Sequence, residues 1–208
     1  DYKYTVKTKV GKVYEATIEW TAPASVDAEA TGAEGEHDGN YYVEYKLGEL
    51  DLSSFTKMYQ IKPNGEVSEL TANTDSNLWF KTNGQVEGSH VFLVKQGGTW
   101  YTATITYPEV ETATFKPVDS IGIHDGKVYE GYKLMAGEDQ IDLVASNIES
   151  MTVLEPGATE PKTLTVGDDS DPLLWFNVQK ATGDYKYTVK TKVGKVYEAT
   201  IEWTAPAS

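Results

Sequence analysis

The chain has 208 residues, a formal net charge of −14, no cysteine, and lysine as its only strongly basic residue type. The length suits one or two domains, and the acidity disfavours binding to nucleic acid or to an anionic membrane face. The lack of cysteine excludes disulfides and thiolate metal sites, and no run of apolar residues reaches the ~18 that a membrane span requires, so we expect no membrane insertion.

The first 25 residues, DYKYTVKTKVGKVYEATIEWTAPAS, return unchanged as residues 184–208. Two explanations stay open, namely a recent tandem duplication and an engineered duplication of a terminal segment. The simplest parent of the first kind is an array with a period of 183 residues, in which the chain begins and ends inside equivalent hairpins.

Apolar and polar residues alternate along residues 2–8 and 14–20, which predicts two strands of a hairpin around a Val10–Lys12 loop. In that register Tyr2 faces Trp20 and Tyr4 faces Ile18. One face of the hairpin is apolar and comprises Tyr2, Tyr4, Val6, Ile18 and Trp20. Because an isolated two-stranded ribbon is only marginally stable, the hairpin is expected to pack on another surface.

After an acidic, alanine-rich stretch at 21–36, a second and more diverged repeat begins. His37-Asp38-Gly39 precedes NYYVEYKL, and 87 positions later His124-Asp125-Gly126 precedes KVYEGYKL. By Trp79-Phe80 and Trp175-Phe176 the offset has grown to 96. Each block then leads into a hairpin, at 89–107 and again at 184–203.

Six or seven short strands with turn signals every 8 to 12 residues make up each block and its hairpin. This pattern is typical of an all-β chain built from β-sandwiches, and no segment sustains a helical period. The predicted division is a duplicated hairpin at 1–25, a first sandwich module at 35–108 and a second at 109–208.

The middle hairpin differs from its duplicated siblings. With an offset of 96, Phe92 and Val94 align with Thr5 and Lys7 of the repeated segment, which are outward-facing there. We therefore expect Phe92 and Val94 to form an apolar outer face that the other module or a neighbouring chain covers.

The acidic turn near residue 170 is a candidate calcium site, because Asp168, Asp169 and Asp171 would supply hard oxygen ligands. Asx turns explain the same residues without a metal. No other cofactor is indicated.

Two further groups have a chemical and a structural interpretation. A sugar-stacking platform would use Tyr41, Tyr42, Trp79, Trp100 and Trp175, for which core packing is the alternative. The His-Asp pairs before each block resemble a base with its orienting carboxylate, but Asp-Gly before a strand favours a hairpin turn. No catalytic motif is present, so an enzyme is not expected.

The final hairpin pattern, Tyr-x-Tyr-x-Val-x-Thr followed by Val-Tyr-x-Ala-Thr-Ile-x-Trp, resembles the immunoglobulin-like modules of prokaryotic cell-surface proteins. This resemblance implies two tandem immunoglobulin-like sandwiches with a duplicated terminal hairpin. It also implies an extracellular or cell-surface location and a structural or adhesive role in a surface layer, stalk or fibre.

Together these features predict a non-enzymatic repeat protein that assembles with copies of itself by strand or hairpin exchange. A carbohydrate-binding module for a glycan or cell-wall polymer is the competing class. Loop closure favours the nearer hairpin, so Tyr185, Tyr187 and Trp203 are expected in the native site of the second module. Residues 1–20 then associate between chains, and deleting 1–25 is expected to leave a folded monomer.

Overall fold

The computed structural model describes residues 1–72 and 74–207. Every regular element among them is a β-strand, so the predicted all-β class is confirmed. The described residues pack into two compact units. The first comprises Asp1–Glu29, Lys46–Leu78 and His90–Ile105, and the second comprises Ala30–Tyr45, Trp79–Ser89 and the chain from Thr106 onward. The module boundaries at 35–108 and 109–208 stay a prediction.

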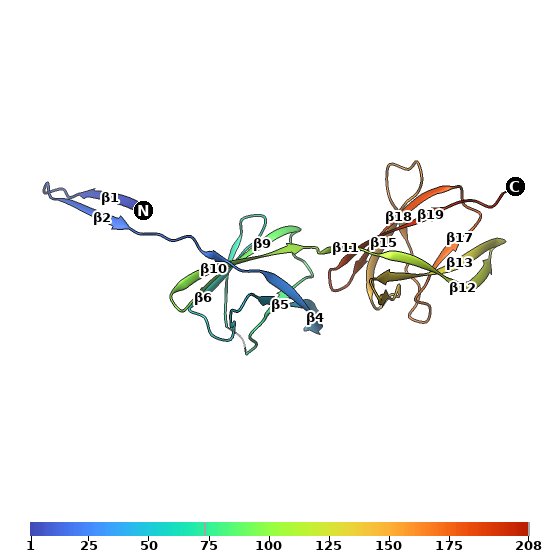
Figure 1. The fold of residues 1–208 in the computed structure, drawn as a ribbon, viewed down its shortest axis with the longest axis horizontal. Coiled ribbons are helices and arrows are strands. Elements are labelled where there is room, and N and C mark those ends of the chain that lie inside the picture. Colours follow the sequence, from blue (N-terminus) through green and yellow to red (C-terminus); the bar gives the residue numbers. More distant parts are fainter. Residues whose placement is uncertain (73, 208) are drawn as a thin grey trace. The chain divides into compact units, whose positions relative to one another are not determined.

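The N-terminal hairpin forms a two-stranded sheet of its own, drawn in blue in Figure 1. It consists of β1 (Tyr2–Lys7) and β2 (Val13–Ile18), which run antiparallel with Tyr2 opposite Ile18. The predicted partner of Tyr2 was Trp20, so the predicted register was wrong by two residues. A shift of two keeps every side chain on its predicted face, and the apolar face is therefore as expected.

The tip of this hairpin explains the shift. The loop spans 9–11 rather than 10–12, and the Gly11 N–H donates to the Thr8 carbonyl at 3.0 Å. Gly11 has φ +83°, a left-handed conformation that glycine adopts without strain. The loop therefore ends on its glycine, and Lys12 already pairs with Thr8.

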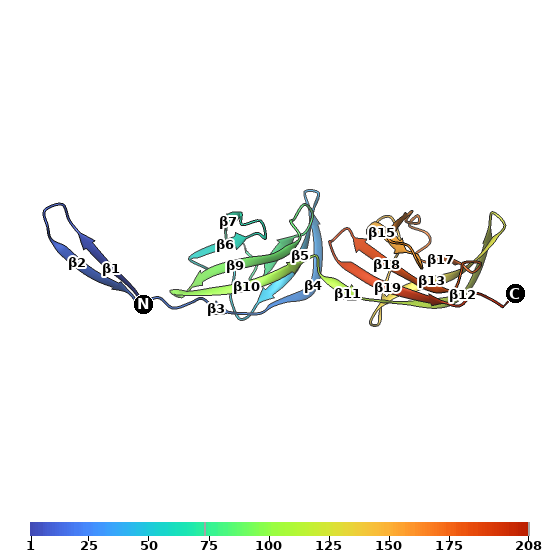
Figure 2. The same ribbon diagram turned by 90° about the horizontal axis from the view of Figure 1, so that it is seen from above.

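The first unit contains most of a five-stranded sheet with strand order β3-β10-β9-β6-β7 (Figure 2). Its strands are β3 (Ala24–Ser25), β6 (Lys57–Ile61), β7 (Val67–Leu70), β9 (Gly88–Gln96) and β10 (Thr99–Tyr107). Strand β6 runs antiparallel to β7 and β9, whereas the short β3 lies parallel to β10. Alternate residues of β9 and β10 are buried, as period two requires.

A three-stranded sheet has the order β4-β5-β8, and most of its residues belong to the second unit. It consists of β4 (Ala28–His37), β5 (Asn40–Leu47) and β8 (Leu78–Lys81). Strand β4 occupies most of the acidic, alanine-rich stretch at 21–36, for which the sequence predicts no strand. Alanine, glutamate and glycine have low strand propensity, and pairing with β5 overrides it here.

The predicted Asp-Gly turns are present at two places. Asp38 and Gly39 both have positive φ, at +50° and +73°, and so do Asp125 and Gly126, at +49° and +71°. Positive φ at both central residues defines the type I′ hairpin turn. The His-Asp pairs are therefore turn residues, and they lie exposed at the surface.

Two further sheets form a β-sandwich in the second unit (Figure 1). One has the order β11-β19-β18-β15-β16, and β13 in the other pairs with β12, β14 and β17. The strands are β11 (Val110–Thr112), β12 (Thr114–His124), β13 (Lys127–Ala136), β14 (Asp139–Ile141), β15 (Ile148–Leu154), β16 (Lys162–Leu164), β17 (Leu174–Asn177), β18 (Gly183–Thr191) and β19 (Val196–Trp203).

The two five-stranded sheets have the same construction. Strands β11, β19, β18, β15 and β16 take the places of β3, β10, β9, β6 and β7. The first strand of each sheet, β3 or β11, lies parallel to the last strand of the following hairpin. The diverged repeat in the sequence is therefore also a repeat in strand order.

One core cluster joins both sheets of the sandwich. Phe176 on β17 lies 5.1 Å between ring centroids from Tyr185 on β18 and 6.2 Å from Tyr132 on β13. Phe115 on β12 lies 4.9 Å from Tyr187 on β18. The contacts of Phe176 with Tyr185 and of Phe115 with Tyr187 cross from one sheet to the other, so the strands close a single core with aromatic rings packed edge-to-face.

The buried tyrosines of this core predict a loss of stability at alkaline pH. Burial raises the pKa of Tyr187 well above its ordinary value of 10.0, and it raises the pKa of Tyr197 to about 12. Their stabilising contribution is fully present below about pH 10 and is lost as the pH rises through the raised folded-state pKa. We expect the free energy of unfolding to fall by about 1.4 kcal/mol per pH unit for each such tyrosine.

Urea unfolding of the second unit between pH 9 and pH 12 measures this slope. The control is Tyr187→Phe, which removes one ionisable group and should make the slope shallower. An unchanged slope in that variant would contradict the assignment.

Candidate assembly surface

The duplicated segment forms the same hairpin at both of its positions. In the C-terminal hairpin, β18 and β19 pair with Tyr185 opposite Ile201, which is the register of Tyr2 and Ile18 moved by 183 residues. The Lys195 N–H donates to the Thr191 hydroxyl at 3.1 Å, as Lys12 donates to Thr8 in the N-terminal hairpin. The repeated sequence therefore specifies its own local structure in two different surroundings.

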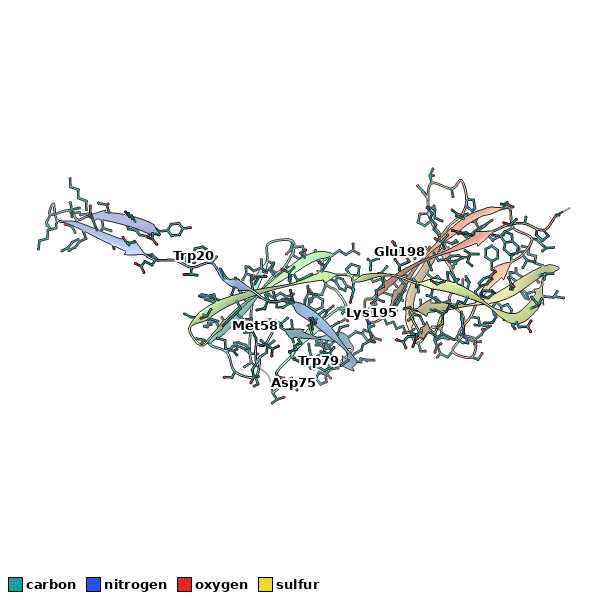
Figure 3. All side chains as sticks on the ribbon, viewed as in Figure 1. Trp20, Met58, Asp75, Trp79, Lys195 and Glu198 are labelled. Atoms are coloured by element: carbon teal, nitrogen blue, oxygen red, sulfur yellow. The ribbon has the colours of Figure 1, made fainter. Side chains whose placement is uncertain are left out.

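The two hairpins differ in what covers their apolar face. In the C-terminal hairpin, Tyr185, Tyr187, Val189 and Ile201 are between 0% and 5% exposed. In the N-terminal hairpin the corresponding side chains are half exposed: Tyr2 58%, Tyr4 50%, Val6 57%, Ile18 53% and Trp20 56%. The ring of Trp20, labelled in Figure 3, lies 6.4 Å between centroids from the ring of Tyr2, and this contact leaves the Trp20 side chain half exposed. The same face is thus a core surface in one place and an open surface in the other.

The C-terminal hairpin shows which surface fits this face. The ring of Trp203 lies 5.1 Å from Phe176, and its indole N–H donates to the Lys180 carbonyl at 3.1 Å. The Tyr185 hydroxyl donates to the Ala181 carbonyl at 2.9 Å. We call residues 109–183, which supply these partners, the core block.

The chain contains one such core block and two hairpins that match it. The C-terminal hairpin fills the block, since its apolar residues belong to the core cluster. The middle hairpin, β9 and β10, is part of the first five-stranded sheet. Among the described residues, the apolar face of the N-terminal hairpin therefore matches the core block, but the C-terminal hairpin already fills that block.

The tip of the C-terminal hairpin makes further contacts within the second unit. A Cβ atom at Gly194 would lie 2.9 Å from both Thr82 and Tyr107, whereas one at Gly11 would meet nothing within 4 Å. Lys195, labelled in Figure 3, forms an ion pair with Glu34 at 3.5 Å. Sequence analysis missed this role of the tip, because nothing in the segment itself distinguishes a contacting loop from a free one.

Two residues of the predicted assembly set lie elsewhere than expected. Phe92 and Val94 are 1% exposed and lie on the buried face of β9, where Val94 pairs with Met58. Met151 pairs with Val189 in the same way, so Val94 corresponds to Val189. The offset along β9 is therefore 95 rather than 96, and this single residue reverses the predicted outward face.

The five aromatic residues of the predicted sugar platform are distributed over three sheets. Trp100 lies near Tyr59, at 6.4 Å between ring centroids, on the sheet of β6 and β10. The Trp79 ring lies next to Gly35 on β4 of the three-stranded sheet, and the Trp175 ring lies next to Gly122 on β12. Tyr41 and Tyr42 belong to β5, and all five side chains are partly buried. Trp100 belongs to the first unit and the other four residues to the second.

The predicted calcium ligands are engaged by different protein donors. Asp168 accepts the backbone N–H of Ser170 at 3.0 Å, Asp169 accepts that of Ser146 at 2.8 Å, and Asp171 accepts the indole N–H of Trp175 at 2.5 Å. Within residues 1–72 and 74–207, no group of three or more such side chains is placed to hold a metal. The three carboxylates are thus not gathered as one ligand group, and the bond from the Ser170 N–H to Asp168 is that of an Asx turn.

An exposed apolar pair also escaped the sequence analysis. Ile121 and Ile123 on β12 are 63% and 79% exposed, and they alternate with Gly122 just before the His-Asp-Gly turn. This alternation is the feature of the sequence that indicates an exposed apolar pair. Comparison of the two repeat blocks does not reveal it, because residues 121–123 precede the matched block.

No family model matches the chain, and no curated protein matches it. Among solved structures, the chain is similar to the human OSCAR ligand-binding domain, with 11% identity and a TM-score of 0.29 over 88% of this chain and 100% of that one. It is also similar to a tetra-tandem repeat in the extending region of a large adhesion protein, with 12% identity and a TM-score of 0.24 over 98% and 56%.

A third similar structure is the BSP domain of a biofilm-associated protein, with 16% identity and a TM-score of 0.26 over 81% of this chain and 28% of that one. The chain thus spans about half of the second structure and about a quarter of the third. Among the described residues, no helix has the length and apolarity needed to cross a membrane. At such TM-scores, function must be inferred from the residues of the chain itself.

Proposed function

We propose that the chain is part of a non-enzymatic structural or adhesive repeat protein of the cell surface, and that its N-terminal hairpin docks on the core block of another molecule or repeat. One observation carries this proposal. The same 25 residues form the same hairpin twice, with the apolar face buried at one position and open at the other.

Burial of the open face provides the driving force. Five large side chains would pass from about half exposed to nearly buried, as in the C-terminal hairpin. Complete burial of one such side chain contributes about 1.5–3 kcal/mol, so the face as a whole contributes on the order of 5 kcal/mol before the costs of association. Identical residues in an identical register also ensure geometric fit.

Stoichiometry decides what the partner is. Exchange of hairpins between two intact molecules releases one hairpin for each that it buries, and it therefore gains no net burial. The acceptor must therefore be a core block that lacks its own hairpin. A repeat array that is divided between the core block and the following hairpin ends in such a block. The surface location is supported by the resemblance of the final hairpin pattern to surface-protein modules.

A mixing experiment tests this proposal. The acceptor is a chain of residues 21–183, which lacks both copies of the hairpin. We expect the intact chain to bind this acceptor in a 1:1 complex and to restore its cooperative unfolding. Size-exclusion chromatography with light scattering and thermal melts measure the two effects.

The matched control is residues 21–208, which keeps β3 because that strand pairs with β10. This variant has no free hairpin and should not bind the acceptor. Equal binding by the intact chain and the control, or binding by neither, would refute hairpin donation.

A further inference from the structure

The turns β4–β5 and β12–β13 are equivalent ends of the two repeats. Both are His-Asp-Gly type I′ turns, 87 residues apart in the sequence. At the position three residues before each histidine the two repeats differ, with Glu34 in the first and Ile121 in the second. At this position the first repeat makes a contact, because Glu34 pairs with Lys195.

Glu34 lines a groove of about 370 Å³ in the second unit, together with Ile141, Tyr197 and Lys195. Its carboxylate pairs with the Lys195 ammonium at 3.5 Å. The first of the two turns therefore adjoins a groove formed by the hairpin tip and the segment before β15.

The first unit contains a corresponding groove of about 490 Å³. Its lining includes Leu50, Gln96 and Tyr101, together with Val26, Gly48 and the charged residues Asp27, Glu29, Lys46 and Glu49. Leu50 corresponds to Ile141 because Asp51-Leu52 matches Asp142-Leu143, and Tyr101 corresponds to Tyr197 in the final strand. The two grooves thus share equivalent positions, and both are formed next to a hairpin tip.

The differences between the grooves match the differences between the ends. Thr99 stands in the first unit where Lys195 stands in the second, and the Lys46 ammonium that lines the first groove already pairs with Glu49 at 3.1 Å. At the second end, Glu34 is replaced by Ile121, which is 63% exposed, and the neighbouring Ile123 is 79% exposed. The Glu34–Lys195 pair of the second unit is thus replaced by Ile121 and Thr99. Each groove therefore prefers the turn whose side chains match it.

We propose that the β12–β13 end of one molecule docks through Ile121 and Ile123 into the Leu50–Tyr101 groove of a second molecule. The contact reproduces between molecules the geometry that Glu34 and its groove show within the second unit. Neither surface includes the duplicated hairpin, so the contact is independent of the proposed hairpin donation.

Crosslinking of the intact chain tests this contact, and the absence of native cysteine makes single-cysteine variants selective. We would mix Ile121→Cys with Thr99→Cys and add a short bismaleimide. The control mixture pairs Ile121→Cys with Val67→Cys, since Val67 is 59% exposed on β7 and lies outside the groove. Docking raises the local concentration of the first pair only, so we expect heterodimers to form at least about tenfold faster there.

A second variant separates docking from chance collision. Adding Ile123→Glu to the Ile121→Cys molecule places a carboxylate where no lysine corresponds to Lys195, and it should reduce the rate to that of the control. Equal rates for the two mixtures, or a fast rate that Ile123→Glu leaves unchanged, would overturn the proposal. Because every molecule keeps both hairpins, this result and that of the mixing experiment are independent.

Discussion

The variant Ile201→Asp is expected to unfold the sandwich of the second unit, whereas Ile18→Asp should leave the melting of the intact chain unchanged. The two substitutions change the same residue in the same 25-residue sequence. Ile201 is 5% exposed and belongs to the core cluster, while Ile18 is 53% exposed. Removing the buried side chain and burying a carboxylate should cost at least about 4 kcal/mol at residue 201.

Calorimetry or circular dichroism measures the difference in melting temperature. Ile18→Asp has a second expected effect, since it should abolish binding to the acceptor of residues 21–183 without altering the fold. A similar loss of stability in both variants would show that the N-terminal hairpin is already packed in solution, and it would contradict the open face.

A chain that ends at residue 183 is expected to polymerise head to tail. This variant has one copy of the duplicated hairpin, β1 and β2, and one core block without its own hairpin. The two surfaces are different and belong to the same molecule, so each contact leaves one free surface at either end. Such heterologous contacts extend into open filaments unless the rotation between neighbours closes a ring.

Light scattering should show a mass that rises with concentration in multiples of the chain mass. A synthetic peptide of residues 184–208, which competes for the core block, should reverse the growth. The control of residues 21–183 has neither copy of the duplicated hairpin and should not form this polymer. A stable monomer of residues 1–183 with a native circular dichroism spectrum would instead show closure within one chain, and would contradict assembly between molecules.

Much of this fold is predictable from the sequence because its strands alternate cleanly. The repeated hairpin is predicted as strands at 2–8 and 14–20, and β1 and β2 lie at Tyr2–Lys7 and Val13–Ile18. Both Asp-Gly turns are predicted, since only a few residue types tolerate positive φ at two successive positions. The apolar face of the repeated hairpin is also predicted, because period two fixes which side chains share a face.

The failures have equally local causes. A hairpin loop moved by one residue changes the partner of every residue in β1 by two, and periodicity alone cannot detect this change. Along β9, the two-residue tip Gly97-Gly98 replaces a three-residue tip, and the resulting offset of one reverses Phe92 and Val94. Strand β4 was missed because its pairing with β5, rather than its composition, makes it a strand.

The candidate site was predictable only in part. The sequence identifies Tyr2, Tyr4 and Ile18 as one apolar face, but it contains no signal for whether that face is covered. The two identical segments differ only in what surrounds them, and surroundings arise from long-range packing. The same limitation applies to the aromatic residues and the acidic turn, whose neighbours come from distant strands.

The parallel strands β3 and β11 have a mechanical consequence. The segment that enters the second five-stranded sheet, β11, lies beside and parallel to the segment that leaves it, β19, with backbone hydrogen bonds from Val196 to Glu109 and from Ala113 to Glu198. Tension applied along the chain therefore pulls these neighbours in opposite directions along their length. Their hydrogen bonds lie across that direction and are loaded together in shear, rather than opened one at a time. Strands β3 and β10 repeat this arrangement, so each sheet resists extension at the point where the load enters it.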